Sequence, residues 1–169
     1  MSKSLEQRIQ VLEDQQALAE LKATYVNYND GGWKGPTHAN PQAVAELFTE
    51  DGTWDGRPSA SYARGRTEIK QLFEAFGAVR FILHYVTNPM ITIDGDEAAG
   101  HWHALVAMTT PADQAMWVMG LYIDKFVRTP EGWKFKSLRF ETAAATPYEL
   151  GWAKQRMLFA DDPFERDNF

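Results

Sequence analysis

The chain of 169 residues contains no cysteine. This absence excludes disulfide bonds, a thiol nucleophile and any cysteine-ligated metal centre. There is also no glycine-rich phosphate loop, no Gly-x-Ser-x-Gly motif and no stripe of basic residues, so nucleotide enzymes, hydrolases of that type and nucleic-acid binders have no support. The formal net charge of −6 further disfavours nucleic acid and anionic membranes as partners.

Long apolar runs are missing as well, both at the N-terminus, where a signal peptide would lie, and in the interior. We therefore expect a cytoplasmic protein. The 44% of hydrophobic and 24% of charged residues are typical of a globular chain, and the length predicts a single domain over residues 1–169. Aromatic residues reach 13%, which favours either a large core or an aromatic-lined pocket.

Residues 4–30 have the apolar spacing of a helix, but the stripe jumps between Leu12 and Leu18. We predict a break near Asp14, with a first helix over about 4–14 that packs outside the domain or on a partner subunit. Gly31-Gly32 supplies the left-handed geometry of a helix end, which places Asp30 at the last turn. A carboxylate there faces the negative end of the helix dipole, and our hypothesis is that it orients a buried histidine.

The rest of the chain predicts two more helices followed by a meander. The predicted helices are 41–49, closed by Asp51-Gly52, and 65–76, with a polar loop over 57–64 between them; the predicted strands are 80–93, 97–110, 114–128 and 132–144. Pro89 demands a bulge or an edge strand. The tail over 147–169 carries apolar residues such as Phe159 and Phe164, so we expect it to fold back over the domain. The result is an α+β fold, a cone-shaped barrel in which a curved antiparallel sheet wraps three N-terminal helices around an apolar small-molecule site.

His84 is the candidate base because both faces of its strand are largely apolar, so its side chain is expected to be buried. Two interpretations stay open from the residues alone: a core histidine bonded to a backbone carbonyl, or a catalytic base whose tautomer Asp30 fixes. Tyr25 could assist, but it lies five residues before Asp30, a turn of about 140° on a regular helix. An ordinary core aromatic is the alternative for Tyr25.

The remaining candidates are residues that strand alternation or aromatic character could place at the pocket. They are Trp54, Asn88, Trp102, His103, Met119 and Arg139. For the aromatic residues core packing is the alternative, and for Arg139 it is an ion pair with Glu141. His101 and His103 share a face and could bind a metal, but the spacing offers no third ligand. We therefore predict no metal and no cofactor.

Four stretches have spacings typical of one superfamily. They are Leu12-Glu13-Asp14 through Tyr25 and Asp30, Leu47-Phe48-Thr49-Glu50-Asp51-Gly52-Thr53-Trp54, His84 through Asn88-Pro89 to Ile93-Asp94-Gly95-Asp96, and Tyr122 through Phe126 to Trp133. Together, over about residues 5–143, they resemble SnoaL-like proteins of the nuclear-transport-factor-2-like superfamily. Within it the chain is most similar to the group of scytalone dehydratase, bile-acid 7α-dehydratase and hexachlorocyclohexane dehydrochlorinase.

The resemblance implies a cofactor-independent lyase of the dehydratase type that acts on a hydrophobic cyclic carbonyl compound, such as a steroid, polyketide or aromatic. His84 and Asp30 match the group's catalytic dyad and Tyr25 its assisting tyrosine. The chain departs from the bile-acid enzyme in having no acid in 104–108 and no arginine near Thr142. A double-bond isomerase, a polyketide-type cyclase and a non-catalytic ligand-binding protein are alternatives. Superfamily members also suggest a homo-oligomer, a dimer or a trimer.

Overall fold

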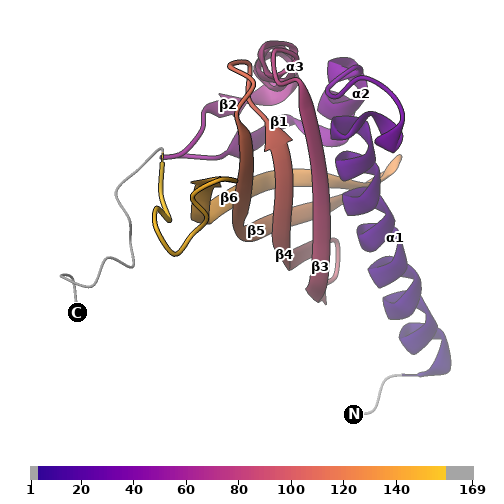
Figure 1. Ribbon diagram of the computed structural model, residues 1–169. Helices are drawn as coiled ribbons and strands as arrows, with labels where there is room; N and C mark the ends of the chain where they lie inside the picture. Colours follow the sequence, from indigo (N-terminus) through magenta and orange to yellow (C-terminus); the bar gives the residue numbers. More distant parts are fainter. Residues whose placement is uncertain (1–3, 159–169) are drawn as a thin grey trace.

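Six strands form one curved sheet in the computed structural model, which describes residues 4–158 (Figure 1). Their order across the sheet is β2-β1-β6-β5-β4-β3. Neighbouring strands are antiparallel except β1 and β6, which are parallel. The strands are β1 (Phe48–Asp55), β2 (Tyr62–Arg64), β3 (Phe81–Asp94), β4 (Glu97–Thr109), β5 (Ala115–Thr129) and β6 (Gly132–Pro147). The four long strands confirm the predicted meander.

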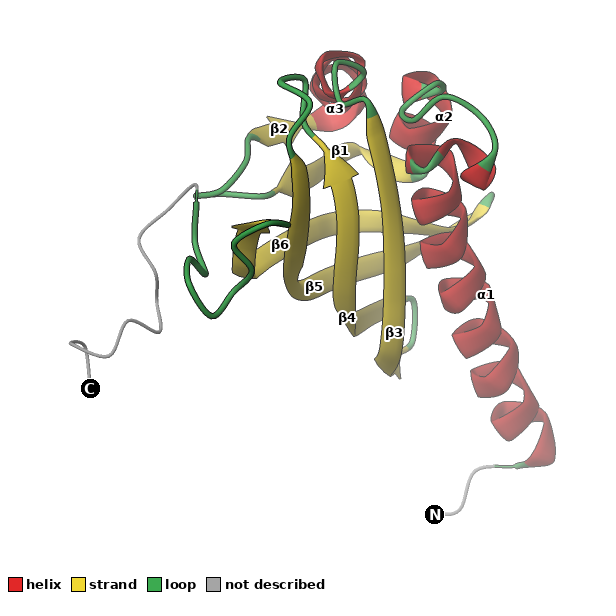
Figure 2. Cartoon of the chain, in the orientation of Figure 1, coloured by secondary structure: helices red, strands yellow, loops and turns green. Residues whose placement is uncertain are grey.

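Three α-helices accompany the sheet, as Figure 2 shows by colour. They are α1 (Leu5–Asn29), α2 (Pro41–Glu46) and α3 (Gly65–Phe76), and a short 3₁₀ turn, η1 (Gly31–Trp33), follows α1. The long helix α1 lies beside β3, while α2 and α3 lie together at one end of the sheet (Figure 1). This arrangement confirms the predicted α+β fold in which a curved sheet surrounds the helices.

The predicted break at Asp14 is wrong, because α1 continues unbroken through that position. Asp14 is buried on the face of α1 that meets the sheet, and its carboxylate accepts hydrogen bonds from the Arg128 guanidinium at 2.7 and 2.8 Å. The apolar stripe therefore does not jump at this point. The charged Asp14 occupies one position of the stripe, because Arg128, 114 residues away on β5, pairs with its carboxylate.

The first turns of α1 carry apolar side chains that the rest of the described chain leaves uncovered. Leu5 and Leu12 are each 64% exposed and Ile9 is 46% exposed. This part of the helix extends past the end of the sheet in Figure 1. That it packs on a partner subunit stays a prediction.

The second predicted helix is shorter than expected, and a strand takes its last residues. α2 ends at Glu46, and Asp51-Gly52 lies within β1 rather than closing a helix. Phe48 begins β1 and is fully buried, with its ring 5.1 Å from that of Phe135 on the parallel strand β6. The predicted polar loop over 57–64 also contains a strand, β2, which pairs with the end of β1. The pairing of β1 with β6 joins segments far apart in the chain, and β2 has only three residues, so local patterns do not reveal either strand in full.

Pro89 lies where the β3–β4 register shifts, between Thr87 and Met90, and β3 is an edge strand. The predicted bulge is confirmed. The tail folds back as far as it is described: the amide of Ala145 donates to the carbonyl of Arg156 at 2.8 Å. Phe159 and Phe164 lie outside the described residues. None of the helices in residues 4–158 combines the length and the apolar character that crossing a bilayer requires.

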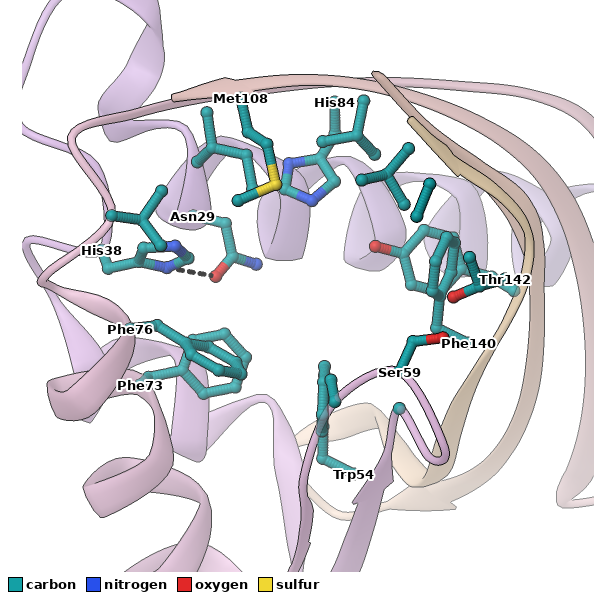
Figure 3. A pocket seen from close by; sticks show the side chains of 18 of the residues that line it. Asn29, His38, Trp54, Ser59, Phe73, Phe76, His84, Met108, Phe140 and Thr142 are labelled. Carbon is teal, nitrogen blue, oxygen red and sulfur yellow. Dashed lines mark hydrogen bonds between the residues drawn. The ribbon is translucent and has the colours of Figure 1, made fainter. Parts of the chain in front are cut away.

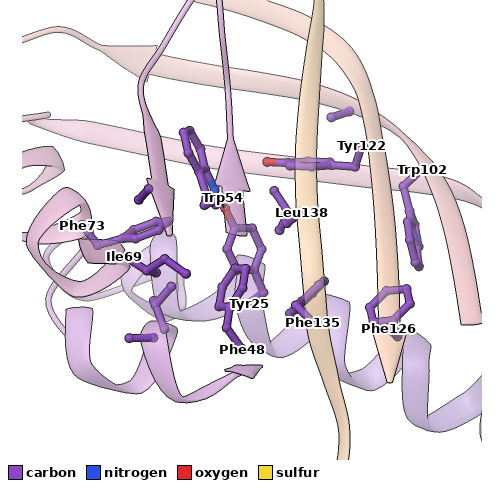
Figure 4. Packing of buried hydrophobic residues seen from close by; sticks show 14 of the residues in the cluster. Tyr25, Phe48, Trp54, Ile69, Phe73, Trp102, Tyr122, Phe126, Phe135 and Leu138 are labelled. Atoms are coloured by element: carbon purple, nitrogen blue, oxygen red, sulfur yellow. Dashed lines mark hydrogen bonds between the residues drawn. The ribbon is translucent and has the colours of Figure 1, made fainter. Parts of the chain in front are cut away.

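The hydrophobic core lies between the helices and the sheet and is rich in aromatic rings (Figure 4). Tyr25 of α1 stands at its centre, in edge contact with Phe48, Phe73, Tyr122 and Phe135 at centroid distances of 5.7–6.5 Å. Such pairs add stability beyond the area that they bury. The core thereby holds α1 rigidly against the sheet, and α1 ends at the site described next.

Candidate active site

A cavity of about 270 Å³ opens inside the curve of the sheet (Figure 3). Strands β3 to β6 form its wall, and α1, α3 and the loop around Ser59 close it. Its lining is largely apolar with a few polar groups: Tyr25, Asn29, His38, Trp54, Gly56, Ser59, Ala60, Phe73, Phe76, Val79, Ile82, His84, Val106, Met108, Val118, Tyr122, Phe140, Thr142 and Ala145. A mostly apolar hollow with few polar groups is the usual form of a small-molecule site.

His84 and Asp30 meet at the wall of this cavity. Nδ1 of His84 lies 2.6 Å from Oδ1 of Asp30, and the backbone N–H of His84 donates to Oδ2 at 2.9 Å. The Asp30 side chain is fully buried and that of His84 is 9% exposed. Because β3 is an edge strand, its free backbone N–H is available to the carboxylate. Both oxygens of Asp30 are thus bonded to one residue.

The end of α1 places Asp30 in this position. Asp30 is the C-cap of α1, and Gly31 and Gly32 follow with φ of +62° and +64°. A Cβ on Gly31 would lie 2.3 Å from the carbonyl oxygen of Pro36, so no other residue fits there. The chain can therefore leave the helix in the left-handed region and fold back at once. The predicted role of the two glycines in ending the helix is confirmed.

The contact with Asp30 determines which nitrogen of His84 is free. A carboxylate is only an acceptor, so Nδ1 of His84 carries a proton toward it. In the neutral imidazole Nε2 is then the lone-pair nitrogen. His84 lines the cavity, as Figure 3 shows, and Nε2 makes no hydrogen bond to any described residue. The arrangement can accept a proton from a molecule in the cavity.

Tyr25 also lines the cavity, although it lies five residues before Asp30. Its hydroxyl oxygen accepts a hydrogen bond from Nε1 of Trp54 at 2.9 Å. Burial raises the pKa of Tyr25 far above its ordinary value, so the hydroxyl keeps its proton. The two residues do not need to share a helix face, because Asp30 bonds to the edge strand while Tyr25 lies between the sheet and α3. Trp54 and Tyr25 are thus both in the cavity wall.

A second histidine lies in the cavity wall, and no sequence pattern indicated it. His38 is buried in the loop between η1 and α2, and its Nδ1 lies 3.2 Å from Oδ1 of Asn29 on α1. Desolvation lowers the pKa of His38 to about 4, with a smaller contribution from the nearby His84. A loop with glycine and proline on either side carries no periodic signal, so burial of His38 could not be inferred.

Five predicted pocket residues lie elsewhere. Trp102 is buried in the core, 5.8 Å from Phe126 in centroid distance, rather than at the cavity. Asn88 lies in the bulge between Thr87 and Met90, where the alternation is interrupted, and its Nδ2 lies 3.1 Å from Nδ1 of exposed His103. Met119 follows Val118, which lines the cavity, so the Met119 side chain points away from the cavity on the other face of the sheet.

Arg139 is the fifth. Its guanidinium pairs with exposed Glu141 at 3.0 Å, the structural alternative expected for it. In its place the cavity wall on β6 has Phe140 and Thr142. β4, the strand after the one that carries His84, contributes only Val106 and Met108 to the cavity wall, so no acidic side chain of β4 lines the cavity.

No group of three or more His, Asp or Glu side chains in residues 4–158 is arranged to hold a metal ion. His101 lies on β4 opposite Met90 and Ile123, outside the cavity.

Comparison with solved structures supports the fold. A candidate scytalone dehydratase of Novosphingobium aromaticivorans is 24% identical, covers 92% of this chain and 95% of its own, and superposes with a TM-score of 0.73. A hexachlorocyclohexane dehydrochlorinase of Novosphingobium barchaimii is 17% identical, with coverage of 83% and 93% and a TM-score of 0.71. A nuclear-transport-factor-2-like protein with a cystatin-like fold, also of N. aromaticivorans, is 23% identical, with coverage of 91% and 96% and a TM-score of 0.66.

No curated protein matches the chain. At these identities the solved structures establish the fold and leave the activity open. A family model is more specific: the SnoaL-like domain matches residues 10–139, most of the chain. The matched range contains Asp30, His84 and every strand up to the first half of β6. The predicted resemblance is thereby confirmed, and the protein belongs to the SnoaL-like family.

Proposed function

We propose that this protein is a cofactor-independent lyase of the dehydratase type, which removes water from a small cyclic carbonyl compound by general acid/base catalysis. The observation that carries the proposal is the 2.6 Å contact between Nδ1 of His84 and Oδ1 of Asp30 at the cavity wall. A buried carboxylate bonded to one imidazole nitrogen, with the other nitrogen in an apolar cavity, is the arrangement that a general base requires.

The reaction begins at Nε2 of His84, which removes a proton from the carbon next to the substrate carbonyl. The electron pair of that C–H bond moves toward the carbonyl, and Asp30 stabilises the imidazolium that forms. The imidazolium then returns the proton to the hydroxyl on the β-carbon. The C–O bond breaks, a C=C bond forms, and water leaves, so no oxidant or other reactant is needed.

Tyr25 is the donor for the carbonyl oxygen in this proposal. Its oxygen already accepts from Trp54, so its own proton is available for the substrate. A hydroxyl that accepts one hydrogen bond is a stronger donor in the next. Because burial raises the pKa of Tyr25, it acts as a neutral donor to the charge that develops on the oxygen.

The cavity volume limits the substrate to one or two rings. An apolar protein cavity of about 150 Å³ binds benzene, and this one has about 270 Å³. A bicyclic ketone fits that volume, while a four-ring steroid does not fit without rearrangement of the wall. Among the expected substrate classes, small aromatics and polyketides are thus favoured over steroids.

The test uses 3-hydroxy-1-tetralone, a bicyclic β-hydroxy ketone whose loss of water gives fluorescent 1-naphthol. We expect the wild type to accelerate this reaction with saturation and His84→Ala to lose about 10²–10⁴ of the rate, the usual share of a general base. His101→Ala is the matched control, because that histidine lies outside the cavity, and it should keep the wild-type rate.

A folded His84→Ala protein with full activity would overturn the assignment. Deuterium uptake at the α-carbon of 3-hydroxy-1-tetralone in D₂O without formation of 1-naphthol would indicate proton transfer without loss of water, as in an isomerase with the same base. Tight binding of 1-tetralone with neither reaction would indicate a ligand-binding protein.

A further inference from the structure

A second imidazole lies in the same cavity wall and has no part in the mechanism above. His38 is on the loop that follows η1, and Figure 3 shows it beside Asn29, across the cavity from Ser59 and Thr142. The ring packs against Phe73 and Phe76, at centroid distances of 5.9 and 5.7 Å. The backbone N–H of His38 donates to the Asn29 carbonyl at 2.9 Å, which fixes the loop to α1. His38 is therefore held on two sides.

The hydrogen bonds of Asn29 determine the tautomer of His38. Nδ2 of Asn29 donates to the carbonyl oxygen of Tyr25 at 2.8 Å, so the amide cannot be turned round without placing two acceptors against each other. Oδ1 of Asn29 must then accept from His38, and Nδ1 of His38 carries the proton. In a neutral ring Nε2 is left as an acceptor, and it has no hydrogen-bond partner among the described residues.

Neutrality of the ring follows from its surroundings. Desolvation, together with a positive charge on His84, lowers the pKa of His38 to about 4, against a smaller opposing contribution from Asp30. A proton on His84 during catalysis thus disfavours a second proton on His38. The two imidazoles divide their tasks accordingly: His84 exchanges a proton and His38 only accepts a hydrogen bond.

We propose that His38 is a substrate-recognition residue whose Nε2 accepts a hydrogen bond from a hydroxyl group on the ring compound in the cavity. This inference rests on the proposed function and narrows its substrate class to compounds that carry a hydroxyl donor besides the reacting carbonyl. Selectivity follows because an acceptor buried in an apolar wall loses its hydration when a ligand without a donor enters.

The experiment compares binding of 6-hydroxy-1-tetralone and 6-methoxy-1-tetralone, which share the carbonyl and differ in the hydroxyl donor, by quenching of tryptophan fluorescence or by calorimetry. We expect the wild type to prefer 6-hydroxy-1-tetralone and His38→Phe to reduce that preference about tenfold, the cost of one unpaired buried hydrogen-bonding group. The phenyl ring keeps the size and the aromatic packing. A purely structural role for His38 would change both affinities by the same factor.

Ser59→Ala is the matched control, because Ser59 Oγ is a buried cavity oxygen without a hydrogen-bond partner in the described chain. Loss of the preference in this variant and not in His38→Phe would overturn the proposal and assign the hydroxyl to the other end of the cavity. Equal preference in wild type and His38→Phe would overturn it while leaving the role of His84 intact. Failure of both tetralones to bind the wild type would overturn the proposed substrate class as well.

A measurement on the wild type keeps the proposal testable if His38→Phe does not fold. In protein labelled with ¹⁵N-histidine, 6-hydroxy-1-tetralone should shift the Nε2 resonance of His38 as expected for a new hydrogen bond, and 6-methoxy-1-tetralone should not. Equal shifts with both compounds would contradict the proposal.

Discussion

Asp30 and Asp124, two of the buried carboxylates at α1, are hydrogen-bonded very differently. Asp30 at the end of α1 is 2% exposed, and both of its oxygens accept hydrogen bonds from His84. Asp124 on β5 is fully buried, and its Oδ2 accepts from Nζ of Lys22 on α1 at 2.8 Å. Its Oδ1 has no hydrogen-bond partner in residues 4–158. One carboxylate is fully satisfied at a cavity, and the other is half satisfied in the core.

The two carboxylates differ in how well their surroundings compensate for the burial of charge. Burial raises the pKa of Asp124 to about 6 and lowers that of Lys22 to about 8, so both charges are disfavoured by their surroundings. The ring of Tyr122 offsets part of that cost, since Nζ of Lys22 lies 3.3 Å from its centroid. We interpret Lys22–Asp124 as a pair that fixes how α1 sits on the sheet, and His84–Asp30 as the pair that does the chemistry.

Exchanging one carboxylate at a time for an amide should separate the two roles most strongly. Asp30→Asn cannot accept from both N–H groups of His84, so the imidazole loses its enforced tautomer. We expect a loss of about 10²–10⁴ in the rate of 3-hydroxy-1-tetralone dehydration. Asp124→Asn should keep most of the rate and lose stability, because it leaves the Lys22 charge without a counter-charge. Equal rate losses in both variants would abolish the distinction.

The core pair itself can be broken from the lysine side. Lys22→Met leaves the Asp124 carboxylate buried and unpaired, which we expect to cost about 3–5 kcal/mol of unfolding free energy in urea denaturation. The double variant Lys22→Met/Asp124→Leu removes both charges and should recover most or all of that loss. If the double variant stays as unstable as the single one, the pair is a net source of stability.

The pH dependence of the double variant is the finest test. In the wild type the folded Asp124 keeps its proton up to about pH 6, whereas an ordinary carboxyl group loses it near 3.8. Unfolding between these pH values therefore releases a proton, so the stability of the wild type falls as pH rises from about 3.8 to 6. Folded Lys22 loses its proton near pH 8 instead of 10.5, so stability returns as pH rises above 8.

The advantage of the double variant should therefore be largest between about pH 6 and 8. It should shrink by about 2–3 kcal/mol toward pH 4 and toward pH 10.5. A flat difference in urea titrations across this range would contradict the assigned shifts.

Much of the site could be predicted where a local signal points to it. The glycine pair ends α1 at Asp30 because only left-handed geometry fits after the last turn, and the alternation in 81–87 places His84 on a strand with Ile82 on the same face. Both residues have a position in a regular element. Their contact followed from the dipole argument and from the resemblance, and the structure brings them to 2.6 Å.

The predictions were wrong where polar residues are buried or where an irregularity changes the alternation. Asp14, Lys22 and Asn29 occupy the buried face of α1, so a stripe defined by apolar residues alone gave a false break. Each is satisfied by a partner distant in sequence or in another element, and no local pattern encodes that. The bulge at Pro89 likewise removed Asn88 from the face that it would otherwise share with His84.

The sequence by itself determined the order and type of the long elements, the end of α1 and the strand that carries His84, since helix and strand periods and glycine geometry are local properties. Only the tertiary structure decided which polar side chains are buried, where β1 pairs with β6, and that His38 joins His84 in one cavity. These depend on partners far apart in the chain, because a buried charge or hydrogen-bonding group is tolerated only where the folded sheet supplies its counterpart.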